Sequence, residues 1–232
     1  MDLSILNFLM NPYFVIAWYG IGLFAAGWTL HDEIFVNRNV NLALKPGWIV
    51  IIIFFSILGF WLYIKSCRPP KIENYSEEEA KKIHHKFVDV IWKKVVGSVI
   101  HCVGGDGLGI MTAMVISRII GFTFWTELWF EYAVGFAFGW FIFQYIAMRK
   151  MGNSPLMSLL KGGRAEFFSM ITVMLGMGLV MKFVTPNVAG YPPKPDSAAF
   201  WGFGSLGLIA GAIVTYPMNW MLVKIGWKHG MS

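Results

Sequence analysis

Long apolar runs separated by short polar segments dominate this chain. A helix needs about 20 apolar residues to cross a bilayer, and six stretches approach or exceed that length: Pro12–Leu30, Pro46–Ile64, Val95–Phe124, Leu128–Ala147, Phe167–Val184 and Ala199–Val223. Backbone groups surrounded by lipid must find their hydrogen bonds within the helix. The pattern therefore predicts an all-α polytopic membrane protein, with about six transmembrane helices in a single domain over residues 1–232.

A different pattern covers Ser76–Lys94. Ser76 is a favourable N-cap, and three glutamates follow where the helix dipole favours acids. Apolar residues then recur at helical spacing on one face, and lysines cover much of the rest. This is typical of an amphipathic helix, here about 76–94, lying on the inner membrane surface. A charged linker with no role beyond topology fits the same residues.

Composition agrees with the membrane interpretation. Hydrophobic residues make up 56% of the chain and charged residues 14%, whereas soluble domains carry about a quarter charged residues. A body of 232 residues cannot enclose so much apolar surface. The expected partners are the lipid bilayer and other membrane subunits. The net charge of +6 does not indicate a nucleic-acid partner, because its distribution follows the predicted loops.

The distribution of basic residues predicts the orientation. With six spans, 14 of the 19 Lys and Arg residues fall on the side that holds the segments 65–94, 148–164 and 224–232, and five fall on the other side. Basic residues mark the cytoplasmic side. The chain is therefore expected to be a multi-pass protein of the cell (plasma) membrane with both termini in the cytoplasm.

Polar residues inside the third apolar run are the first candidates for a site. Cys102 and Asp106 are one helical turn apart, and His101 stands beside them. A thiol, an imidazole and a carboxylate within one turn suit copper or zinc. The alternative is close helix packing, because the same segment holds four glycines that let another helix approach: Gly104, Gly105, Gly107 and Gly109.

A second set of polar residues lies at one depth on three other predicted helices, near the cytoplasmic face. These residues are Gln144, Glu166, Tyr216 and Asn219. They predict either a hydrogen-bonded network that locks the bundle or a shallow site open to the cytoplasm. The sequence His31-Asp32-Glu33 after the first run is a weaker metal candidate, because polar residues at helix ends are usually solvated.

Several of these segments resemble a known family. Phe143-Gln144-Tyr145, Lys161 before the fifth run, the ending Tyr216–Lys224 (YPMNWMLVK) and His101-Cys102-x-x-Gly105 look like the prokaryotic membrane family called domain of unknown function 4396. The resemblance extends from about residue 48 to the end. It implies a bacterial or archaeal membrane protein of uncharacterised function.

The chain departs from the family pattern at several positions. The resemblance implies a second Cys where this chain has Asp106, and acids where it has Ile110, Gly163 and Ile171. A site without those acids would bind a divalent cation poorly. The departures favour a structural role over metal handling.

Three functions remain open. The first is a non-catalytic structural or accessory subunit of a larger membrane complex, for example a respiratory or copper-dependent oxidoreductase. The alternative is a membrane copper transport or delivery protein that uses His101, Cys102 and Asp106. The third is a membrane enzyme with a site around His101, Gln144, Glu166 and Asn219. Because the sequence has no nucleophile-and-base pair, phosphate loop or zinc helix, it predicts no catalytic residue and no certain cofactor.

Overall fold

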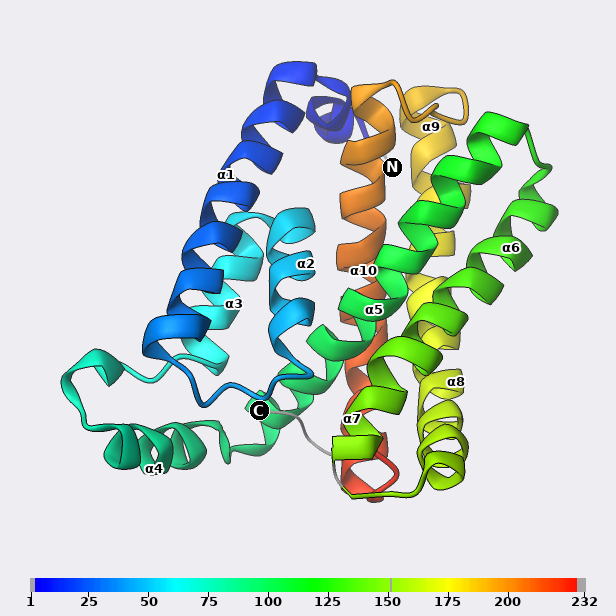
Figure 1. Cartoon of the computed structure of the whole chain (residues 1–232). Helices are drawn as coiled ribbons and strands as arrows, with labels where there is room; N and C mark the ends of the chain where they lie inside the picture. The colour runs from blue at the N-terminus through cyan, green and yellow to red at the C-terminus, as the bar shows by residue number, and fades with distance from the viewer. Residues whose placement is uncertain (1–2, 151, 229–232) are drawn as a thin grey trace.

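The computed structural model describes residues 3–150 and 152–228, apart from the side chain of Lys150. This part of the chain is helical and contains no β-strand. Long helices run side by side between an upper and a lower end, as drawn in Figure 1. The helices, including short 3₁₀ and π segments (η), follow this order: η1 (Ser4–Met10), α1 (Pro12–His31), η2 (Asp32–Val36), α2 (Lys45–Phe55), α3 (Ile57–Ser66), η3 (Ile72–Asn74), α4 (Glu77–Val88), α5 (Ile91–Ile120), α6 (Phe124–Ala137), η4 (Phe138–Gln144), α7 (Tyr145–Lys150), α8 (Pro155–Leu179), η5 (Val180–Val184), α9 (Thr185–Ala189) and α10 (Ala198–Lys224).

Four helical segments are long and apolar enough to cross a membrane, judged by length and composition: Pro12–Val36, Ile91–Ile120, Pro155–Ala189 and Ala198–Lys224. The run α6–η4–α7 lies alongside them from the upper to the lower end (Figure 1). The all-α prediction is confirmed. The structure supports four candidate spans and does not establish six.

The second predicted span, Pro46–Ile64, is not one continuous helix. It divides at Ser56 into α2 and α3, and these two short helices form a hairpin that starts and ends at the lower end (Figure 1). Ser56 has φ 51° and ψ −130°, a backbone conformation that side chains with a Cβ rarely adopt. The serine hydroxyl donates to the Trp18 carbonyl oxygen at 2.7 Å and so ties the turn to α1.

The hairpin changes which loops lie together. The segment between η2 and α2 lies at the lower end with α4, whereas η1 lies at the upper end and α10 finishes at the lower end (Figure 1). The two ends of the described chain are therefore on opposite sides of the bundle. This arrangement disagrees with the expectation that both termini share one side.

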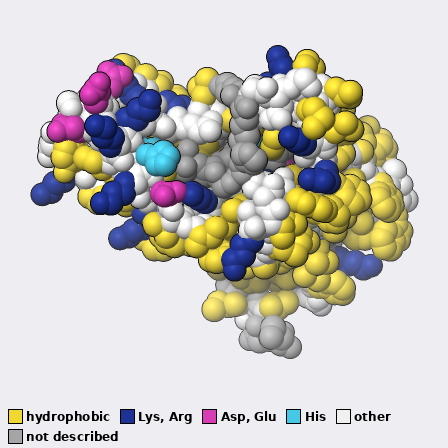
Figure 2. All heavy atoms as spheres, turned by 90° about the horizontal axis from the view of Figure 1, so that it is seen from below, with side chains coloured by type: hydrophobic (Ala, Val, Ile, Leu, Met, Phe, Trp, Pro, Cys, Tyr) yellow, Lys and Arg dark blue, Asp and Glu magenta, His cyan; other side chains and the backbone are white. Residues whose placement is uncertain are grey.

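Basic residues gather strongly at the lower end. Of the 19 Lys and Arg residues, three belong to upper segments, Arg118, Lys182 and Lys194, which leaves 16 in lower segments. Figure 2 shows Lys and Arg side chains spread over this lower face. The asymmetry is larger than the sequence alone predicts, because Arg38 in the loop after η2 and Lys45 at the start of α2 lie on the basic side.

The predicted amphipathic helix corresponds to α4, which lies across the lower end almost perpendicular to the long helices (Figure 1). It begins with a capping box in which the Ser76 backbone N–H donates to Glu79 Oε2 at 3.2 Å. Its buried face includes Ala80, His84 and Val88. The helix ends at Val88, earlier than the predicted Lys94.

Helix α5 occupies the centre of the bundle, where glycines allow close contact with its neighbours. A Cβ at Gly104 would lie 2.8 Å from the Gly47 Cα of α2, and one at Gly109 would lie 2.8 Å from the Gly135 Cα of α6. The packing role predicted for these glycines is present at both positions. Close contact brings the polar faces of α5, η4, α8 and α10 together.

Candidate functional site

A cluster of polar side chains is enclosed in the lower half of the bundle. The side chains come from α5, η4, α8, α10 and the segment just after α10, and none is more than 1% exposed: Ser98, His101, Cys102, Asp106, Gln144, Glu166, Ser169, Asn219 and Lys228. Buried groups of this kind normally pair with one another, because unpaired polar atoms in an apolar medium are costly.

Glu166 of α8 accepts hydrogen bonds from two other elements. The Cys102 thiol donates to Glu166 Oε2 at 3.2 Å, and Gln144 Nε2 donates to the same oxygen at 2.8 Å. Gln144 is the last residue of the π segment η4. π segments shift the register of a helix and often occur at functional sites. This one presents Gln144 to the cluster.

The carboxyl groups of Asp106 and Glu166 meet beside Gly139 of η4. A Cβ on Gly139 would overlap Asp106 Oδ1 and would lie 2.5 Å from Glu166 Oε1. Only a residue without a side chain leaves room for both carboxyl groups. Two carboxyl groups at such close range disfavour ionisation of both at once.

Lys228 supplies the positive charge of the cluster. Its Nζ donates to Asn219 Oδ1 at 2.7 Å, to Ser169 Oγ at 3.0 Å and to Cys102 Sγ in a short contact. Burial alone lowers the pKa of Lys228, but Cys102, Glu166 and Asp106 more than offset it and hold the pKa above its usual value. The ammonium uses its three donors on Asn219, Ser169 and Cys102.

Hydroxyl groups extend the cluster along α10. Ser98 Oγ donates to Asn219 Oδ1 at 3.1 Å, and Asn219 Nδ2 donates to Thr215 Oγ1 at 3.0 Å. Thr215 and Thr172 share a further hydrogen bond of 2.7 Å. The cluster therefore links α5, η4, α8 and α10 in one network.

The structure places three of the four predicted inner-layer residues in this network: Gln144, Glu166 and Asn219. The fourth, Tyr216, is half-buried and packs against Trp220 with ring centroids 5.9 Å apart. Its neighbour Thr215 points into the network instead. The sequence did not reveal Lys228, because it resembles any basic residue that follows the last helix. It also did not reveal the hydroxyl residues of the network, Ser98, Ser169 and Thr215, because serine and threonine are common in helices.

The predicted metal candidates His101, Cys102 and Asp106 all belong to the cluster or its edge. Neither ring nitrogen of His101 and neither carboxyl oxygen of Asp106 has a hydrogen-bond donor or acceptor that satisfies it, and the His101 ring meets Phe143 edge-on at 5.5 Å. Within residues 3–150 and 152–228, no three His, Cys, Asp or Glu side chains converge as metal ligands. Metal binding by these residues stays a prediction.

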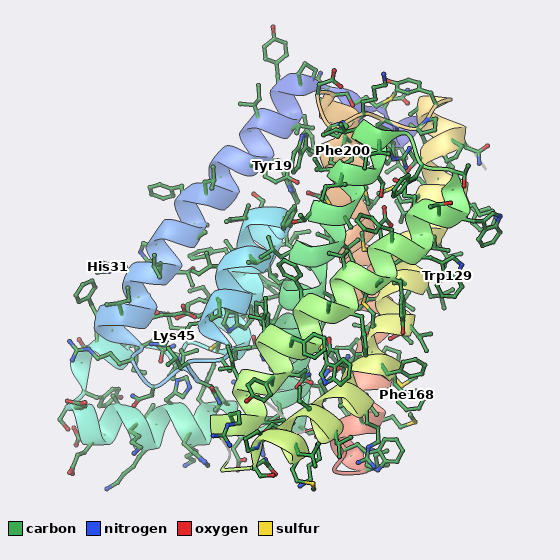
Figure 3. The ribbon with its side chains drawn as sticks, turned by 45° about the vertical axis from the view of Figure 1, so that its right-hand side comes forward. Tyr19, His31, Lys45, Trp129, Phe168 and Phe200 are labelled. Atoms are coloured by element: carbon green, nitrogen blue, oxygen red, sulfur yellow. The ribbon has the colours of Figure 1, made fainter. Side chains whose placement is uncertain are left out.

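The three residues of the weaker metal candidate at the end of α1, His31-Asp32-Glu33, do not point to one place. His31 is exposed and points away from the bundle (Figure 3). Asp32 and Glu33 point inward and are 2% and 0% exposed. The adjacent His84 and His85 also point apart, with His84 buried and His85 exposed.

Residues 91–228 match the sequence model of a domain of unknown function, DUF4396. The chain belongs to this family. The matched region begins with α5 and ends at Lys228, so it contains every member of the buried network. No curated protein and no solved structure matches the chain.

The positions at which this DUF4396 member departs from the expected pattern can now be located. Gly163 packs against the Trp140 ring, Ile171 is exposed, and Ile110 is buried. Glu166, three residues after Gly163, supplies an acid to the cluster from the same helix. Glu166 and Asp106 thus bring two acids into the buried cluster.

Proposed function

We propose that this chain is a non-catalytic structural subunit of a larger membrane-embedded complex. The observation that carries the proposal is the closure of the buried network by the chain's own ammonium group. Lys228 contacts Cys102, Ser169 and Asn219, where a substrate or metal would have to bind. Side chains that are fully enclosed and mutually bonded stabilise helix packing rather than meet a ligand.

The outer surface offers a region suited to another membrane subunit. A groove of about 640 Å³ lies between α6 and α8, and its lining is almost entirely apolar. Trp129 projects outward from α6 on this side (Figure 3), and Gly178 adjoins open space. A small residue in an apolar groove is typical of contacts between transmembrane helices.

The proposal is tested by extracting the chain from its native membrane in mild detergent and determining the stoichiometry of bound subunits. A fixed set of partners is expected. Gly178→Trp should reduce their recovery at least tenfold, because the indole fills the groove. Gly27→Trp on α1 is a matched control, because a Cβ at either glycine meets nothing within 4 Å. Recovery of the chain as a stable lone monomer would exclude the proposal.

Closure of the network is tested separately with Lys228→Met. Removing the ammonium leaves buried acceptors on Cys102, Ser169 and Asn219 without this donor, at a cost of about 1–3 kcal/mol for each unsatisfied group, and the Cys102 thiol should become reactive to a small maleimide. Lys224→Met is the control, because Lys224 is exposed and lies 5.8 Å from the Trp220 ring centroid. Unchanged Cys102 labelling in Lys228→Met would show that Lys228 does not close the network.

A membrane copper transport or delivery protein is the second candidate. It is favoured by one specific observation, the unpartnered nitrogens of His101 beside the Cys102 thiol. Metal analysis of protein purified without chelator tests it, with Cys102→Ser as the variant. Bound copper or zinc that disappears in Cys102→Ser would favour this function over the structural one.

We also propose that the protein resides in a prokaryotic cell membrane, with its lower, basic end in the cytoplasm. Five segments would cross the bilayer, whereas the second predicted span, Pro46–Ile64, would enter and leave on the cytoplasmic side. The positive-inside rule and the hairpin at Ser56 support this orientation. A respiratory or copper-dependent oxidoreductase is the class of complex that we propose to test first.

A further inference from the structure

The apolar groove between α6 and α8 has walls that follow the helical repeat. The stripe on α8 and η5 recurs every three or four residues and includes Phe167, Ile171, Met174, Gly178 and Lys182. Aromatic residues of α6 form the opposite wall, and Trp129 projects outward among them (Figure 3). The groove is therefore shaped by two helices and can accept a third element lying along them.

Lys182 is the charged residue of this lining, among the described residues that form it. It lies within the candidate span Pro155–Ala189, near the upper end of the bundle. Its Nζ lies 5.1 Å from the centroid of the Phe124 ring and 4.9 Å from that of the Trp125 ring. An ammonium within about 6 Å of a ring centroid is attracted to the ring face. These contacts hold the charge beside the groove.

The described part of the chain supplies no counter-charge to Lys182. The nearby acid Glu127 pairs with Arg118 Nε at 2.6 Å, and Glu131, one turn further along α6, is only 7% exposed. Within residues 3–150 and 152–228, no carboxylate forms an ion pair with Lys182, and no acceptor takes a hydrogen bond from its Nζ. Charged groups within a membrane span normally pair with another group, so the groove favours an occupant that carries a negative charge.

The length of the groove favours a helix over a lipid tail. From Phe167 to Lys182 the wall extends about 22 Å at 1.5 Å per residue. The hydrocarbon core is about 30 Å thick, so the acyl chains of one leaflet reach about 15 Å. A lipid with its headgroup at Lys182 would leave the lower part of the groove empty, whereas a helix that crosses the bilayer fills it.

We propose that the groove binds a transmembrane helix of another subunit, and that an Asp or Glu of this helix pairs with Lys182. The inference rests on the proposed function and specifies its partner as an apolar helix with a carboxylate level with Lys182. A lone acid within a span is costly, so the two charges stabilise each other when the helices meet. The ion pair fixes the register of the bound helix, and the apolar stripes supply the contact area.

The experiment is treatment of native membranes with a membrane-permeant carbodiimide, which joins an amine and a carboxyl group that are in contact. The reagent activates the partner's carboxyl group, and the Lys182 amine attacks the activated carbonyl carbon. An amide bond forms and the carbodiimide leaves as its urea. We expect a crosslink from Lys182 to an Asp or Glu in an apolar segment of a copurifying subunit, identified by peptide mass spectrometry.

Two substitutions separate the charge of Lys182 from its amine. Lys182→Arg should lose the crosslink but keep the subunit, because the guanidinium remains charged and does not form the amide. Lys182→Met should lower recovery of the subunit at least tenfold after mild detergent extraction, because the partner's carboxylate is left unpaired. Lys194→Met, which removes another exposed lysine at the upper end, is the control and should leave recovery unchanged.

The outcomes distinguish this inference from the proposed function. Equal recovery of the subunit from Lys182→Met, or a wild-type subunit that gives no crosslink to Lys182, would overturn the inference, as expected if a lipid phosphate pairs with Lys182. Either result would leave the proposed structural role unaffected. A wild-type chain extracted without any fixed subunit would overturn both.

Discussion

Gly139 shows how one residue without a side chain makes the buried network possible. The Asp106 and Glu166 carboxyl groups converge at the position that a Cβ would occupy. Gly139 and Gln144 both belong to the π segment η4, and both are buried. A residue-scale feature of the sequence, a glycine in an aromatic-rich helix, thus determines where two acids meet.

Gly139→Ala is expected to destabilise the protein by about 2–3 kcal/mol, because the methyl group forces the two carboxyl groups apart in a packed interior. Thermal unfolding in detergent measures the effect. Gly20→Ala is the matched control, because a Cβ there meets nothing within 4 Å, and alanine is the better helix former. Equal stability of the two variants would mean that the carboxyl groups do not meet at Gly139.

At the scale of elements, the hairpin of α2 and α3 depends on Ser56. A continuous helix is about 1 kcal/mol less stable with glycine than with alanine at an interior position. At the positive φ of Ser56, glycine is the better residue. The relative stability of two substitutions therefore distinguishes a hairpin from a single span.

We expect Ser56→Gly to be more stable than Ser56→Ala by about 1 kcal/mol. Both variants lose the hydrogen bond to the Trp18 carbonyl, so the comparison isolates the backbone conformation. Chemical denaturation of the two proteins in the same detergent measures the difference. The opposite order would indicate a straight helix through residue 56.

A second element-scale prediction concerns α4 and pH. Burial, with a smaller contribution from the neighbouring His85, lowers the pKa of His84 to about 4. Because the unfolded pKa is about 6.5, the contribution of neutral His84 to stability is complete above pH 6.5 and is lost as pH falls towards 4. Hydrogen exchange of α4 should therefore accelerate between pH 6.5 and 4, after correction for intrinsic rates.

His84→Leu should largely remove that pH dependence, because leucine keeps the buried volume without a titrating group. His85→Leu is the control, since His85 is exposed. Protection of α4 that responds to pH equally in His84→Leu and in the wild type would assign the effect to other groups.

At the scale of the whole molecule, the hairpin decides at which end of the bundle each loop lies. Cysteine substitutions at exposed positions should report this through labelling with an impermeant maleimide, because native Cys67 and Cys102 are buried. Arg38→Cys and Lys81→Cys should label from one side, and Lys194→Cys from the other. Six complete spans would instead place Arg38 and Lys194 together.

The apolar pattern of the sequence was sufficient to predict the helical class, the main long helices and α4. It could not predict the break at Ser56, because α2 and α3 together have the length and hydropathy of one span. The break is stabilised by a contact with α1, and a one-dimensional pattern does not contain such tertiary contacts.

The candidate site was predictable to a similar extent. Polar residues within apolar helices pointed to His101, Cys102, Asp106, Gln144, Glu166 and Asn219, because buried polar groups are costly. Lys228 and Ser169 could not be found in this way. A lysine after the last helix resembles any cytoplasmic residue, and only the fold turns its side chain inward.

The position of Lys228 in the chain also affects the order of assembly. The two acids lie on α5 and α8, but their counter-charge follows α10 and is synthesised later. Until then, the nascent bundle contains a carboxyl pair that lacks its cation. The charge balance of the interior is therefore completed only after α10 has been synthesised, and a chain that stalls before Lys228 would leave two buried acids without their neighbouring positive charge.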